Sequence, residues 1–281
     1  MKSGFVLPDI DLKNIGELAH QAEQAGWDGV FIPDCISIET KTIPAVPFYD
    51  PWIALGIVAA RTSRIHFGTM VTAMPRRRPW KLARETMTLD HLSNGRFILA
   101  VGLGAAADDA GFYKVGEAMD LKTRAELLDE GLEILAGCWS GKPFSFQGKH
   151  YQVDHMTLVP APIQSPRIPI WVVGVWPKTK SVNRALRWDG IIPQKYKPKP
   201  KEMYMKPEEI AEVRALVEKN RKAPGMFDII ASGTTPGKNN KRAIQQVQPY
   251  AEAGATWWLE AAWGAAAEKV RAHIQQGPPR E

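Results

Sequence analysis

Three short stretches of the sequence have the residue types needed to bind an anion. Gly102-Leu103-Gly104 ends an apolar run, and its missing side chains would let a ligand approach the backbone. Gly174-Val175-Trp176 leads into a predicted helix, whose first N–H groups are unpaired and carry about half a positive charge. Gln194-Lys195 offers a hydrogen bond and a formal charge. A lone G-x-G is weak evidence for anion binding, so an ordinary turn is the alternative interpretation of Gly102-Leu103-Gly104. The same alternative applies to Gly174.

Two carboxylates follow predicted strands and are the candidates for catalytic chemistry. Asp34 follows the second strand, and Glu260 ends the eighth, where we expect it to face the mouth of the fold and polarise a substrate. A loop hydrogen-bonding role is the alternative for both. None of the six histidines ends a predicted strand, and Cys35 and Cys138 form no C-x-x-C pair. The sequence therefore predicts no metal site and disfavours a metal-dependent hydrolase.

The charge balance narrows the classes of ligand. The formal net charge is +6, which favours anionic ligands such as phosphates. The excess positive charge is dispersed along the chain, and no nucleic-acid recognition motif accompanies it, so we expect no nucleic-acid binding. No apolar run approaches the roughly 20 residues of a membrane helix, and the first residues lack the apolar core of a signal peptide. Together with unpaired cysteines, this predicts a cytoplasmic protein.

The elements that must position these residues alternate along the whole chain. Short apolar runs that read as strands alternate with amphipathic or apolar helices. About eight of each predict a single (β/α)8 barrel over residues 1–281, with a doubly wound open sheet as the alternative. Residues 141–166 are expected to form a hairpin-like insertion between the fourth and fifth strands. The predicted strands are 5–7, 27–32, 65–71, 96–101, 169–173, 189–192, 227–231 and 255–259.

Several motifs resemble the bacterial-luciferase-like flavin-dependent oxidoreductases. They lie on most of the predicted strands, so the resemblance covers nearly the whole chain and is specific to the superfamily. The segments that carry it are G-T-M-V-T at 68–72, P-R-R-R-P-W-K-L-A-R-E at 75–85, L-D-H-L-S-N-G-R at 89–96, V-G-L-G at 101–104, A-G-W-D-G-V at 25–30, I-W-V-V-G at 170–174, W-D-G at 188–190 and G-A-T-W-W-L-E at 254–260.

The resemblance implies where a cofactor would bind. Members of this superfamily hold FMN or the deazaflavin coenzyme F420 at the carboxyl face of a (β/α)8 barrel. A bulge at the end of the third strand, often with a non-proline cis peptide, supports the ring, and it falls on Thr69, Met70 and Val71 here. The cofactor phosphate would lie between the loops that follow the fifth and sixth strands, near Gly174-Val175-Trp176 and Gln194-Lys195.

Two positions depart from the pattern of the family. Relatives often have a second glycine where this chain has Val175, which puts the shape of the phosphate loop in doubt. They also often have Asp-His after the second strand, whereas this chain has Asp34-Cys35. A mechanism that uses a histidine base at this place is therefore in doubt.

The resemblance favours an enzyme and leaves three functions open. The first is a monooxygenase that uses reduced FMN and oxygen on a small organic substrate, with a flavin reductase as a potential partner. The second is a hydride-transfer oxidoreductase that uses coenzyme F420, and the third is a non-catalytic flavin-binding or cofactor-free barrel. The resemblance also implies a homodimer.

Overall fold

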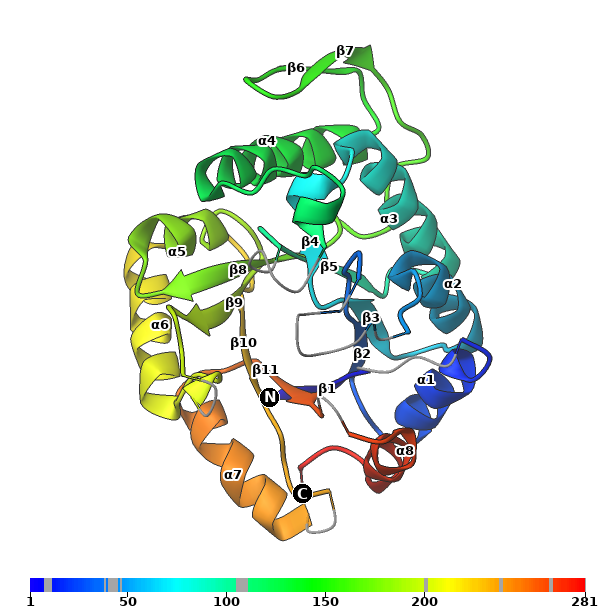
Figure 1. Ribbon diagram of the computed structural model, residues 1–281, viewed down its shortest axis with the longest axis vertical. Helices are drawn as coiled ribbons and strands as arrows, with labels where there is room; N and C mark the ends of the chain where they lie inside the picture. Colours follow the sequence, from blue (N-terminus) through cyan, green and yellow to red (C-terminus); the bar gives the residue numbers. More distant parts are fainter. Residues whose placement is uncertain are drawn as a thin grey trace.

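The computed structural model of the chain is a closed parallel barrel surrounded by helices (Figure 1). It describes residues 1–7, 12–37, 39, 45, 47–104, 111–199, 202–237, 240–262 and 265–280. Within these residues, the third barrel strand is split into the short segments β3 and β4. The barrel strands are β1 (Lys2–Val6), β2 (Gly29–Ile32), β3 (His66–Thr69) with β4 (Thr72–Ala73), β5 (Phe97–Gly102), β8 (Ile170–Trp176), β9 (Gly190–Lys195), β10 (Asp228–Gly233) and β11 (Trp257–Ala261).

The hydrogen-bond ladder closes on itself, as the barrel prediction requires. Strand β1 pairs with β2 on one side and with β11 on the other, so the first and last strands of the chain are neighbours. Both β3 and β4 pair with β5, and β5 pairs with β8. All these pairings are parallel, which confirms the (β/α)8 barrel and rules out the open doubly wound sheet.

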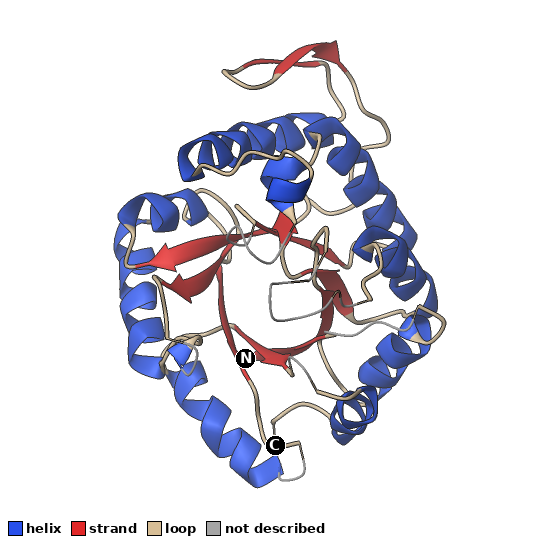
Figure 2. Cartoon of the chain, in the orientation of Figure 1, coloured by secondary structure: helices blue, strands red, loops and turns tan. Residues whose placement is uncertain are grey.

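The helices form a ring outside the strands (Figure 2). Each predicted strand overlaps an observed one, and the helices fall between them as the sequence pattern indicates. The α-helices are α1 (Ile15–Gln24), α2 (Pro51–Arg61), α3 (Pro79–Ser93), α4 (Leu121–Trp139), α5 (Thr179–Ala185), α6 (Pro207–Asn220), α7 (Asn240–Glu252) and α8 (Ala267–Gln276), and the short 3-10 helices are η1 (Met74–Arg76) and η2 (Phe112–Lys114).

Local signals explain where these helices begin and end. The Asp50 carboxylate accepts the backbone N–H groups of Trp52 at 2.9 Å and Ile53 at 3.1 Å, which caps the start of α2. At the end of α3, Asn94 and Gly95 have φ values of 56° and 80°, the left-handed backbone that stops a helix.

Two charged side chains fix the chain just before β3. The Glu23 carboxylate accepts the backbone N–H groups of Ser63, Arg64 and Ile65 at 3.0, 2.6 and 2.8 Å. The buried Arg96 guanidinium donates to the carbonyl oxygen of Ile65 at 2.8 Å. These contacts satisfy backbone groups that the barrel would otherwise bury without partners, and so set the position of the strand.

The barrel interior is filled at its amino end and open at its carboxyl end. The side chains of Phe31, Trp171 and Trp257 fill the interior nearer the amino end, with ring centroids 5.2 to 6.0 Å apart. Inward-facing residues nearer the carboxyl ends are smaller, including Ser232 and Ala261. Large rings below and small side chains above leave space at one end of the barrel, the end where barrel enzymes bind ligands.

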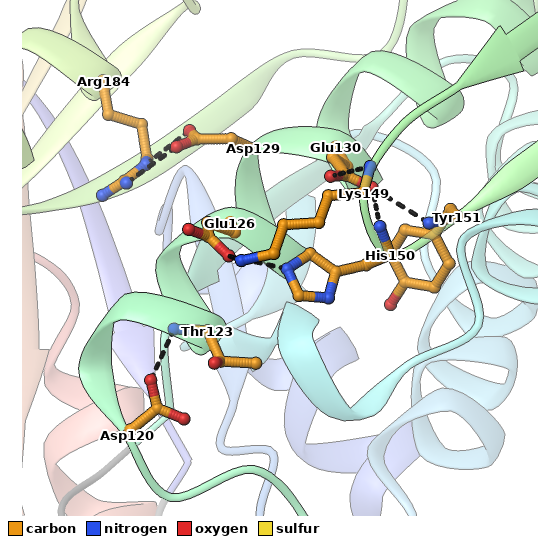
Figure 3. Close-up of polar contacts among 9 residues, drawn as sticks. All are labelled: Asp120, Thr123, Glu126, Asp129, Glu130, Lys149, His150, Tyr151 and Arg184. Carbon is orange, nitrogen blue, oxygen red and sulfur yellow. Dashed lines mark hydrogen bonds and ion pairs between the residues drawn. The ribbon is translucent and has the colours of Figure 1, made fainter.

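The predicted insertion is an antiparallel hairpin of β6 (Phe144–Gln147) and β7 (Gln152–Met156), and it lies outside the ring of helices (Figure 1). The Glu130 carboxylate on α4 accepts the backbone N–H groups of Lys149, His150 and Tyr151 at 2.8 to 3.0 Å (Figure 3). Glu126, one helical turn earlier, accepts Lys149 Nζ at 2.7 Å and His150 Nε2 at 2.8 Å. Two carboxylates of one helix therefore hold the hairpin turn against α4.

Two features are absent from the described ranges. No helix in them is both long and apolar enough to cross a membrane. Nor do they contain a group of three or more His, Cys, Asp or Glu side chains placed to hold a metal ion.

Candidate functional site

A cavity of about 380 Å³ opens at the carboxyl end of the barrel. Its wall is drawn from the ends of five strands and from the loop that follows β9. The lining residues are Val6, Met70, Val71, Ile192, Pro193, Gln194, Lys195, Pro198, Met203, Tyr204, Met205, Ile230, Ser232 and Ala261. Apolar side chains form most of this surface, and the polar ones come mainly from β9 and its loop.

The break between β3 and β4 forms one wall. The peptide bond between Met70 and Val71 is cis, which confirms the non-proline cis peptide that the family resemblance places here. Met70 and Val71 line the cavity, and the Met70 N–H donates to the carbonyl oxygen of Ile32 at 2.8 Å. Thr69 is buried behind them, with its hydroxyl 2.6 Å from that of Thr72. Thr69 therefore supports this wall of the cavity without lining it.

The two glycines that follow β5 have different surroundings. A Cβ atom on Gly102 would lie 3.3 Å from Val71 and 3.1 Å from Val173, so Gly102 borders the cavity wall. A Cβ atom on Gly104 would lie 2.6 Å from the ring of Phe112, and its φ of 86° requires glycine. Gly104 is thus packed beneath a side chain, which matches the turn interpretation of G-x-G better than the anion cradle.

The end of β8 differs from the prediction in two ways. The strand does not end at Gly174 but continues to Trp176, pairing with β9 up to Lys195. A Cβ atom added to Gly174 would lie only 2.6 Å from the side chain of Ile191. This position of Gly174 therefore faces the helical layer. In addition, the Val175 N–H donates to the Ser181 hydroxyl at 3.0 Å, so this backbone group already has a partner in the structure.

On β9, Gln194 and Lys195 both line the cavity, as the sequence analysis requires of a ligand site. Gln194 is exposed, whereas Lys195 Nζ forms an ion pair with Glu209 of α6 at 2.9 Å. Burial alone raises the pKa of Glu209, but hydrogen bonds from Lys195 and from the Lys206 backbone outweigh it and lower that pKa. Lys195 therefore brings a positive charge that is already partly balanced.

Asp34 belongs to a buried cluster with two arginines. Arg77 lies 2.7 Å from Asp34 Oδ1, and Arg76 contacts the same oxygen, while Asp34 Oδ2 has no hydrogen-bond partner among the described residues. Burial raises the pKa of Asp34, and the charges of Arg76 and Arg77 oppose that shift. Asp34 does not line the cavity, so its position supports a structural ion pair rather than a catalytic group.

Glu260 does not face the barrel mouth, and that expectation is wrong. Its carboxylate accepts hydrogen bonds from the Thr235 backbone at 2.7 Å, the Thr235 hydroxyl at 2.8 Å and Trp258 Nε1 at 3.2 Å. Along β11, Trp257, Leu259 and Ala261 point inward, which leaves the fully buried Glu260 on the outer side.

The structure adds cavity residues that the sequence analysis missed. Ile192 and Ile230 face inward near strand ends, but each follows an isoleucine that faces outward, so the apolar pattern of the sequence does not single them out. Met203, Tyr204 and Met205 come from the loop after β9, where no sequence pattern indicates that the chain turns back over the barrel. The Tyr204 hydroxyl lies 3.5 Å from the Ala261 carbonyl oxygen, the outer limit of a hydrogen bond.

Comparisons with known proteins agree with this architecture. The chain is 32% identical over 160 residues to an F420-dependent glucose-6-phosphate dehydrogenase of Nakamurella multipartita, a match of 56% of this chain and 45% of that protein. It thus spans about half the length of that curated relative.

Solved structures share the fold over nearly the whole chain. The coenzyme F420-dependent tetrahydromethanopterin reductase of Methanopyrus kandleri has a TM-score of 0.76 and 18% identity, covering 98% of both chains. The monooxygenase RslO1 of Streptomyces bottropensis has a TM-score of 0.77 and 17% identity, covering 98% of this chain and 97% of that one. The model of the luciferase-like monooxygenase family matches residues 2–279, and this chain therefore belongs to that family.

Proposed function

We propose that this chain is an oxidoreductase that holds the deazaflavin coenzyme F420 at the barrel mouth and exchanges a hydride between it and a small organic substrate. The observation that carries the proposal is the cavity of about 380 Å³, walled by the cis Met70–Val71 peptide. The curated relative with 32% identity is named as F420-dependent, which favours this cofactor.

The lining of the cavity suits a flat ring with a polar edge and an anionic chain. Val6, Ile192 and Ile230 provide an apolar surface, and Met70 and Val71 provide a wall. Such a surface excludes water and fixes the plane of a ring by contact.

Polar groups near one side of the cavity would orient the ring and its chain. Gln194, Ser232 and Tyr204 offer hydrogen-bonding side chains, and Lys195 offers an ammonium. We assign Gln194 and Lys195 to the start of the anionic chain, because they lie at the carboxyl end of β9. The backbone roles predicted for Gly174 and Trp176 stay predictions.

Hydride chemistry would be supplied by the cofactor, and the protein would bind, orient and shield the reacting groups. Among the described residues that line the cavity, only Lys195 and Tyr204 have ionisable side chains, and none is a carboxylate or an imidazole. A proton that accompanies the hydride would therefore pass through Tyr204 or solvent.

A monooxygenase that uses reduced FMN and oxygen is the second candidate. The tricyclic rings of FMN and the deazaflavin have the same shape, so the cavity accommodates both. FMN ends in a single phosphate, for which Gln194 and Lys195 would suffice.

Anaerobic titration of the purified protein with F420 and with FMN, followed by cofactor fluorescence, tests the proposal. We expect tighter binding of F420, and hydride transfer from an added alcohol or sugar phosphate without oxygen consumption. Ser232→Trp fills the cavity and should abolish binding, whereas Met226→Trp, at a residue 86% exposed, should not. Preference for FMN with oxygen consumption would favour the second candidate, and binding of neither would favour a cofactor-free barrel.

A further inference from the structure

Next to the cavity, two exposed lysines contact one tyrosine ring, and a third lies close by in the chain. We call Lys178, Tyr196, Lys197 and Lys199 the basic rim. Lys178 Nζ lies 4.0 Å from the centroid of the Tyr196 ring, and Lys197 Nζ lies 5.6 Å from it. Both distances are within the range of a cation–π contact, so a single ring holds two ammonium groups near each other.

The charge of the basic rim is not balanced within the described part of the chain. None of its three lysines forms an ion pair there, whereas the neighbouring Lys195 is paired with Glu209. Residues 195–206 contain five lysines and one glutamate, so the sequence around the rim supplies little negative charge. Like charges held together without a partner create a positive field that favours a ligand with several negative charges.

Backbone contacts fix the rim beside the cavity. The Tyr196 N–H donates to the Trp176 carbonyl oxygen at 3.1 Å, and the Lys178 N–H donates to that of Val175 at 2.7 Å. The residues on both sides of this loop segment, Lys195 and Pro198, line the cavity. A ligand chain that leaves the cavity past β9 would therefore meet the rim directly.

We propose that the basic rim binds the oligocarboxylate chain of coenzyme F420, which extends beyond the phosphate as linked glutamates. This inference rests on the proposed function, since it assigns the outer part of the same ligand. FMN ends at its phosphate and would stop near Lys195, so the rim selects the deazaflavin through charges that FMN lacks. Each exposed lysine contributes little, and several contacts along one chain add up.

The test compares two deazaflavins that share the same tricyclic ring. One is F420 with its oligoglutamate chain, and the other lacks both the phosphate and that chain. Their dissociation constants are measured by fluorescence for the wild-type protein and for the double variant Lys178→Gln, Lys197→Gln. The control variant Lys142→Gln, Lys222→Gln removes the same charge from exposed positions off the rim.

We expect the rim variant to weaken F420 binding by about four- to tenfold at low salt, roughly two- to threefold per lysine. The loss should shrink as salt is added, because salt screens exposed charges. Binding of the chainless deazaflavin should be unchanged in both variants, and F420 binding should be unchanged in the control.

The outcomes separate this inference from the proposed function. Equal affinity of the wild-type protein for the two deazaflavins, or equal weakening of both in the rim variant, overturns the rim assignment and leaves the cavity assignment intact. If neither deazaflavin binds, both are overturned.

Discussion

Replacing Asp34 by asparagine should destabilise the barrel strongly, although the change removes only a charge. The Asp34 side chain is fully buried, and the side chains of Arg76 and Arg77 are 10% and 18% exposed. In the variant, two guanidinium groups would face each other in a region with little water. Nothing else among the described contacts of this cluster would neutralise them.

The size of the effect follows from the burial of the charges. Two unit charges about 4 Å apart interact by about 4 kcal/mol at an effective dielectric constant near 20. Removing one partner of a buried ion pair usually costs about 3–5 kcal/mol, because the remaining charge stays desolvated. We therefore expect Asp34→Asn to lower the free energy of unfolding by about 3–5 kcal/mol, a large share of the total for a typical domain.

Urea unfolding followed by tryptophan fluorescence measures this change, since the ten tryptophans of the chain report on the barrel. Adding Arg77→Gln to Asp34→Asn should recover part of the loss, with a coupling energy of about 1–3 kcal/mol between the two sites. Asp154→Asn, at an exposed position on the hairpin, serves as the control. A midpoint for Asp34→Asn as close to wild type as that of the control would refute the structural role of the ion pair.

Three further outcomes are expected. Burial alone would raise the pKa of Glu23, but hydrogen bonds from the backbone N–H groups of 63–65 outweigh burial and lower that pKa. The Glu23 carboxylate therefore stabilises the fold above about pH 4.3, and this stabilisation is lost as the pH falls below that value. Glu23→Gln should remove this acid-dependent loss of stability in unfolding curves. Gly102→Leu should weaken deazaflavin binding by about tenfold in the fluorescence titration, with an unchanged circular dichroism spectrum, because the side chain enters the cavity wall. Burial raises the pKa of Cys138 to about 11, so a thiol reagent at pH 8 should modify the half-buried Cys35 first, and equal rates would contradict this.

The barrel could be read from the sequence because its signals are local. Continuous apolar runs mark strands that are covered on both faces, and residues such as Pro51 and the Asn94-Gly95 pair mark where helices begin and end. The strand ends were less certain. Strand β8 runs three residues past its predicted end at Val173, because pairing with β9 extends it through Gly174.

The candidate site was only partly predictable. Met70, Val71, Gln194 and Lys195 line the cavity, and the first two were placed there by family resemblance. Tyr204 was missed, because nothing local indicates that a loop of this composition turns back over the barrel.

The sequence by itself determined the alternation of strands and helices, and hence which residues lie near the carboxyl ends of the strands. Only the tertiary structure decided which way those residues face. On β11, apolar residues occupy both faces, so alternation does not reveal that Glu260 points outward. The partners of Asp34 lie more than forty residues away in the chain, and only the parallel pairing of β2 with β3 brings their charges together. A side chain's chemistry depends on the solvent and charges around it, and these are set by contacts distant in sequence.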